Sequence, residues 1–101
     1  MGLGRIEAGD GRTLVFVFGD VDTAREAELV AMFEDAVGMG QPVVIDAGGI
    51  EFIDSSGLRA LVIGHQLCEK ASLPLGIRNL TPRIERVLEI GGLDGLIPRM
   101  D

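Results

Sequence analysis

The sequence predicts one α/β domain, with a mixed, mostly parallel sheet of four or five strands packed with at least three helices. Three observations support this prediction. The chain has 101 residues, 47% hydrophobic and 25% charged, which is typical of a single globular domain spanning 1–101. Apolar runs at 13–18 and 43–46 are typical of strands inside a sheet. Segments with the apolar spacing of amphipathic helices follow each run.

The strand candidates are residues 3–8, 13–18, 43–46, 73–78 and 96–98. Gly9-Asp10-Gly11 supplies residues that tolerate positive φ, so we expect a hairpin turn after the first candidate. The run 13–18 does not alternate, which favours a strand covered on both faces, and 19–22 is expected to be a turn. We expect Gly48 and Gly49 to end the strand at 43–46.

The helix candidates are residues 23–37, 55–71 and 82–90. The first opens with Thr23 and Glu26 at the spacing of a capping box. The second is expected to begin near Ser55 or Ser56. The third has Thr81 as an N-cap, followed by proline at the first helical position.

Composition excludes several classes of protein. Nine Lys and Arg against sixteen Asp and Glu give a net charge of −7, which argues against binding nucleic acid or an anionic membrane surface. The single cysteine, Cys68, cannot form an internal disulfide and is expected to be a buried core thiol. The chain shows no membrane-spanning run and no secretory signal, so we expect a cytoplasmic protein.

The segment from Phe52 to Leu58 places two hydroxyls and a carboxylate where a loop enters a helix. The free N–H groups at a helix start favour negative charge, so the fold would tolerate a phosphate on Ser55 or Ser56. Ordinary N-capping by Asp54 or a serine explains the same residue types. Physical chemistry alone leaves both interpretations open.

The chain resembles the STAS domain family, and within it the bacterial anti-anti-sigma factors, also called anti-sigma factor antagonists. The residues that carry the resemblance are Gly19-Asp20-Val21-Asp22-Thr23-Ala24, Val43-Val44-Ile45-Asp46, Ile50-Glu51-Phe52-Ile53-Asp54-Ser55-Ser56-Gly57-Leu58, Leu80-Thr81-Pro82 and Gly92-Leu93. The Asp-Ser-Ser-Gly-Leu stretch is the specific part. The family commonly has Glu where this chain has Asp20, a difference of one methylene.

The resemblance implies a binding protein that is not an enzyme and needs no cofactor. Its partner would be an anti-sigma factor that is also a serine/threonine kinase and holds the ATP. The unmodified protein would bind this kinase and release the sigma factor. Phosphorylation of Ser55 would end binding, and a PP2C-type phosphatase would reset it. The partner-binding residues would be Asp20, Asp22, Asp54, Ser55, Ser56, Gly57, Leu58 and Val62.

Helical phase, independently of the resemblance, suggests where a partner docks. Leu58 and Val62 fall within the polar arc of the second helix, one turn apart and just after Ser55. We expect them to form an exposed apolar docking patch. The alternative is that the third helix or a loop covers them.

Two other classes of function fit the sequence poorly. A response-regulator receiver could use Asp46 as phosphoacceptor, but the only lysine, Lys70, lies within a predicted helix. A serine hydrolase would need a base near Ser55, and His65 lies about ten residues further along, roughly 15 Å up the helix axis. We expect His65 to be an exposed polar residue.

The main alternative lies within the same fold. Some STAS domains are scaffolds of stressosome-like assemblies or accessory subunits of ABC transporters, without a phosphorylation cycle. The retained Asp-Ser-Ser-Gly stretch favours the switch, because a scaffold would need only a cap.

Overall fold

The structure is a computed structural model that describes residues 2–100. The elements, in chain order, are β1 (Gly4–Gly9), β2 (Arg12–Val21), a 3₁₀ turn η1 (Thr23–Arg25), α1 (Glu26–Gly38), β3 (Val43–Ile53), α2 (Ser55–Lys70), β4 (Leu75–Arg78), α3 (Pro82–Ile90) and β5 (Arg99–Met100). The five strands form one sheet in the order β1-β2-β3-β4-β5. β1 is antiparallel to β2, and the other pairs are parallel. The predicted fold class is confirmed.

The turn between β1 and β2 is the predicted hairpin. Asp10 has φ of 53° and Gly11 has φ of 77°. Two consecutive positive φ angles match the right-handed twist of the flanking strands, which is why short hairpins favour residues such as these.

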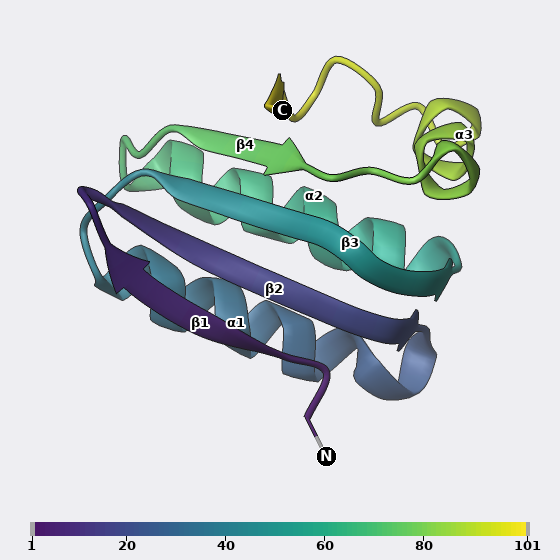
Figure 1. Ribbon diagram of the computed structural model, residues 1–101, viewed down its shortest axis with the longest axis horizontal. Helices are drawn as coiled ribbons and strands as arrows, with labels where there is room; N and C mark the ends of the chain where they lie inside the picture. The colour runs from purple at the N-terminus through teal and green to yellow at the C-terminus, as the bar shows by residue number, and fades with distance from the viewer. Residues whose placement is uncertain (1, 101) are drawn as a thin grey trace.

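The helices α1 and α2 lie side by side on one face of the sheet (Figure 1). Because the parallel strands follow one another in chain order across the sheet, right-handed crossovers place their connecting helices on the same side. Residues 13–18 therefore alternate, with Val15 and Val17 in the core and Phe16 only half-buried on the other face. The expectation that this strand is covered on both faces was wrong.

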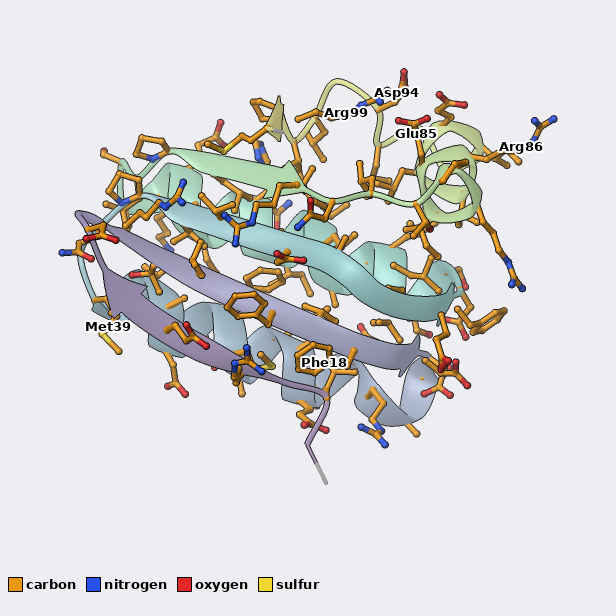
Figure 2. All side chains as sticks on the ribbon, in the orientation of Figure 1. Phe18, Met39, Glu85, Arg86, Asp94 and Arg99 are labelled. Carbon is orange, nitrogen blue, oxygen red and sulfur yellow. The ribbon has the colours of Figure 1, made fainter. Side chains whose placement is uncertain are left out.

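The second face of the sheet is open to solvent. Phe18 is 40% exposed there, on the side away from α1 and α2 (Figure 2). The Arg5 guanidinium lies 4.5 Å from the centroid of the Phe16 ring and 5.6 Å from that of Phe18. Stacked cations of this kind cover aromatic rings that no helix shields.

β2 and β3 are longer than predicted, and this extension positions the candidate site. Residues 19–21 continue β2, and Gly48 and Gly49 lie within β3 instead of ending it. Gly49 pairs with Phe18, and a Cβ there would lie 2.4 Å from Cδ1 of that ring. The glycine therefore lets the ring approach the neighbouring strand without breaking it.

The remaining strand bounds differ in smaller ways. β4 begins at Leu75, not at residue 73, and β5 is formed by Arg99–Met100, not by 96–98. The predicted start of α3 is confirmed, because the Thr81 hydroxyl accepts a hydrogen bond from the Ile84 N–H at 3.4 Å. Within residues 2–100, no helix combines the length and the apolar character needed to cross a bilayer.

Candidate functional site

Ser55 is the first residue of α2 and is exposed. The helix is capped by Asp54, whose Oδ1 accepts hydrogen bonds from the N–H groups of Ser56 at 2.9 Å and Gly57 at 3.1 Å. Asp54 thus satisfies the first free amides of the helix. Asp54, and not Ser55, is the N-cap, and Ser55 is an exposed residue at the positive end of the helix dipole.

Ser56 lies in a different environment from its neighbour. It is only 6% exposed, and its Oγ lies 2.9 Å from Oγ1 of Thr23 in η1. This hydrogen bond joins the start of α2 to the turn that precedes α1. The two adjacent serines therefore differ in solvent access, since Ser55 is exposed and Ser56 is buried.

Gly57 is required by close packing. A Cβ at this position would lie 2.4 Å from the carbonyl oxygen of Val21 and 2.6 Å from Cγ1 of Ile53. The first turn of α2 thus rests directly on the ends of β2 and β3. The glycine in the Asp-Ser-Ser-Gly stretch has this structural role.

The extension of β2 and β3 brings the acidic segment to the same end of the sheet as Ser55. Asp20 pairs with Phe52 in the sheet, and the Asp54 N–H donates to the carbonyl of Val21 at 3.3 Å. Asp20 is exposed, whereas Asp22 is half-buried and accepts a hydrogen bond from the Ala24 N–H at 3.1 Å. Capping of η1 therefore accounts for Asp22, whereas Asp20 is exposed.

The predicted capping box at Thr23 and Glu26 was wrong. Asp22 caps the η1 turn, and α1 begins only at Glu26. Both residues of the predicted box instead bond to α2: Thr23 to Ser56, and Glu26 to Arg59. Nε of Arg59 lies 2.9 Å from Oε2 of Glu26, and Nη2 lies 3.3 Å from Oε1.

Sequence reasoning missed this ion pair. Glu26 and Arg59 are 33 residues apart, and each has the pattern of a solvated residue on the polar side of its own helix. Only the spacing of Arg59, four residues after Ser55, could have drawn attention to it.

Leu58 and Val62 are half-buried and pack against the core. A Cβ at Gly91, just after α3, would lie 2.6 Å from Cδ1 of Leu58. The expectation of an exposed pair was wrong, because the end of α3 closes over Leu58. The larger apolar side chains exposed on neighbouring elements are Phe52 and Ile90.

Two other predictions on α2 had different outcomes. Cys68 is buried, as expected, and burial raises the pKa of its thiol. His65 was expected to be exposed but is half-buried, with Nε2 4.0 Å from Oε2 of Glu69. Its place on α2, well beyond the first turn, keeps it away from Ser55.

Asp46 does not resemble the phosphoacceptor of a receiver domain. It lies in the middle of β3, only 8% exposed. Its Oδ2 accepts from Nε of Arg78 at 3.0 Å and from Nδ2 of Asn79 at 2.9 Å, and its Oδ1 accepts from the Gly48 N–H at 3.0 Å. Among residues 2–100, no three His, Cys, Asp or Glu side chains are grouped so that they could hold a metal ion.

A family model described as "Mlab, STAS domain" matches residues 5–98. The chain belongs to the STAS domain family. This STAS domain is 29% identical over 90 residues to BtrV of Bordetella bronchiseptica, named as a candidate anti-sigma factor antagonist, with 88% of this chain and 78% of that protein covered.

Solved structures place this STAS domain beside anti-sigma factor antagonists in fold. One from Mycobacterium paratuberculosis matches with a TM-score of 0.83 and 28% identity, covering 95% of this chain and 82% of that one. SpoIIAA of Bacillus, solved in a phosphorylated form, matches with a TM-score of 0.71 and 18% identity, covering 97% and 91%. At that lower identity, the match shows a shared fold.

Proposed function

We propose that this STAS domain is an anti-sigma factor antagonist whose binding to a partner is switched off by phosphorylation of Ser55. The unmodified form binds an anti-sigma factor that is also a serine kinase, and this frees the sigma factor in the cytoplasm. The observation that carries the proposal is the contrast between the exposed Ser55 and the buried, hydrogen-bonded Ser56. The similarity to proteins named as anti-sigma factor antagonists supports the antagonist role. SpoIIAA, which shares the fold and is also named an antagonist, has been solved in a phosphorylated form.

The electrostatics of the site favour a switch in this direction. Phosphorylation adds a charge of about −1.5 to −2 at pH 7. Asp54 adjoins Ser55, and Asp20 is exposed at the same end of the sheet. The phosphate would add negative charge to an already acidic surface. A partner surface that fits a neutral hydroxyl would then have to desolvate this charged group on binding. A loss of about 1.4 kcal/mol already weakens binding tenfold.

The proposed contact surface consists of the start of α2 and the acidic end of β2. Ser55 and Asp20 contact the partner directly. Asp54, Ser56 and Gly57 hold the helix start in place, and Asp22 caps the turn beside it. Leu58 and Val62 contribute the exposed edges of half-buried side chains. A PP2C-type phosphatase completes the proposed cycle.

The proposal is tested by incubating the protein with candidate anti-sigma kinases and ATP, followed by mass spectrometry of proteolytic fragments. We expect one phosphate on Ser55 in the wild type and in Ser56→Ala, and none in Ser55→Ala. Asp20→Asn, which keeps shape and removes charge, should slow the reaction without lowering the melting temperature. Ser56→Ala is the matched control, because it removes the neighbouring hydroxyl.

Binding of each form to the kinase is then measured by calorimetry. Ser55→Ala should bind like the unmodified protein, and phosphorylated protein or Ser55→Glu should bind at least about tenfold more weakly. Phosphate found on Ser56 alone would remove Ser55 as the site. If the kinase and ATP add no phosphate to Ser55 and ATP leaves partner binding unchanged, the result would instead favour a non-switching scaffold or a transporter-associated subunit.

A further inference from the structure

The ion pair between Glu26 and Arg59 joins the first residue of α1 to the second turn of α2. Arg59 engages Glu26 through two nitrogens, at 2.9 and 3.3 Å. The Arg59 side chain is 62% exposed and that of Glu26 is 24% exposed. Because most of the Arg59 side chain is in solvent, the guanidinium can move away from Glu26 without displacing other residues.

Arg59 also lies within reach of the proposed modification site. Residues four apart on a helix share a face, and helical side chains incline toward the N-terminus. Arg59 follows this geometry, because its Nη2 lies 3.5 Å from Oγ of Ser56 in the first turn. Ser55 is four residues before Arg59 and one residue closer to the helix start than Ser56.

We propose that Arg59 exchanges partners when Ser55 is phosphorylated, leaving the Glu26 carboxylate for the phosphate on Ser55. This inference rests on the proposed function, because it describes how phosphorylation of Ser55 changes the ion pairs around it. Arg59 is a positioning residue in this scheme and takes no part in phosphoryl transfer.

The charges decide the direction of the exchange. The phosphate carries about twice the charge of the Glu26 carboxylate and offers three acceptor oxygens to the guanidinium fork. Glu26 and the phosphate repel each other, so a guanidinium between them moves toward the more highly charged group. Asp20, Asp22 and Asp54 are further acidic groups at this end of the sheet, and they also repel the phosphate. Arg25, next to Glu26, has its Nη1 3.7 Å from Oε1 of Glu28.

The consequence is a switch with two outputs. Before modification, the surface beside Ser55 presents a neutralised ion pair across α1 and α2. After modification, it presents a phosphate neutralised in part by Arg59 and an uncompensated carboxylate on the first turn of α1. A partner that spans both helices therefore meets altered charge on each of them, and not only at Ser55.

The test uses the 101-residue chain with phosphoserine inserted at position 55 during synthesis, and follows the phosphate by ³¹P NMR from pH 4.5 to pH 8. The second pKa of the phosphate, ordinarily about 6, should be lower in the wild type than in Arg59→Gln by about 0.15–0.4, the size that an i,i+4 ion pair supplies. Glu26→Gln frees the arginine and should lower that pKa further. Arg59→Lys should restore part of the shift.

Lys70→Gln is the matched control, because it removes a cation from the far end of the same helix and should leave the pKa unchanged. Circular dichroism melting checks that each variant is folded. Equal pKa values in wild type and Arg59→Gln, or an unchanged value in Glu26→Gln, would overturn the exchange. Since no kinase is needed, this result is independent of whether a kinase modifies Ser55, and the two proposals can fail separately.

Discussion

At the scale of single residues, the open face of the sheet depends on one nearly buried carboxylate. Burial alone would raise the pKa of Asp46, but hydrogen bonds from the Gly48 N–H, Arg78 and Asn79, together with the charge of Arg78, lower it below its ordinary value of 3.8. The guanidinium of Arg78 also lies 6.0 Å from the centroid of the Phe16 ring. The cluster thereby joins β2, β3 and the end of β4.

The Asp46 cluster predicts how stability depends on pH. A carboxyl whose folded-state pKa is depressed binds fewer protons when folded, so its stabilisation is present above pH 4 and is lost as the pH falls through the folded pKa. Asp46→Asn should lower the free energy of unfolding by about 1–3 kcal/mol at pH 7, because Arg78 loses its charged partner. This deficit should shrink in acid.

Denaturant unfolding of wild type and Asp46→Asn between pH 3 and pH 7 measures that deficit. Asp10→Asn, at the exposed hairpin turn, is the control for general loss of negative charge. A deficit that stays constant across this range would show that the ionised form of Asp46 is not what stabilises the sheet.

At the scale of elements, α1 and α2 approach closely at Gly64. A Cβ at Gly64 would lie 2.6 Å from two carbons of the Phe33 ring, which is fully buried on α1. Glycine in the middle of a helix is destabilising relative to alanine in isolation. The Phe33 ring, which packs against Gly64, explains why a glycine is present here. This close approach of α1 and α2 also allows Glu26 and Arg59 to form their ion pair.

Replacing glycine by alanine inside a helix usually stabilises it, but at Gly64 we expect the replacement to destabilise the protein. Gly64→Ala gains up to about 1 kcal/mol of helix propensity but overpacks against Phe33, so we expect a net loss of about 1–2 kcal/mol in the free energy of unfolding. Gly38→Ala, at the end of α1 with open space around it, should be neutral or stabilising by up to about 1 kcal/mol. Chemical denaturation of both variants makes the comparison. Equal effects at the two positions would contradict close packing at Gly64.

At the scale of the whole molecule, one core lies between the sheet and its covering helices. Cys68 is 1% exposed within this core, and burial raises the pKa of its thiol. The thiolate is the reactive form, so both burial and the raised pKa protect this cysteine. Its reactivity therefore reports the opening of the core.

We expect Cys68 to react with a thiol reagent at pH 8 at least about 10³-fold more slowly in the folded protein than in the unfolded chain, because reaction requires global opening. Adding denaturant should raise the rate with a slope that approaches the equilibrium m-value. Gln66→Cys in a Cys68→Ser background places a thiol on the exposed side of α2 and should react at once. Fast labelling of Cys68 in buffer would mean that α2 detaches locally.

Much of this architecture could be predicted from local signals. Backbone preferences predicted the hairpin turn at Asp10-Gly11 and the helix start at Thr81-Pro82. Apolar residues close together in sequence predicted the strands at 13–18 and 43–46. A motif at a helix start likewise pointed to Ser55, and the STAS resemblance rested on it. These features need no knowledge of distant contacts.

Tertiary structure alone decided how far the strands run and what surrounds Ser55. The bonds from Thr23 to Ser56 and from Glu26 to Arg59 each span 33 residues, and no local pattern encodes such pairs. The open sheet face follows from the order of all the parallel strands, and the cover on Leu58 follows from the place where α3 ends. Local sequence determines backbone preference and which side chains prefer burial, whereas the partners of a polar surface group depend on which elements pack together.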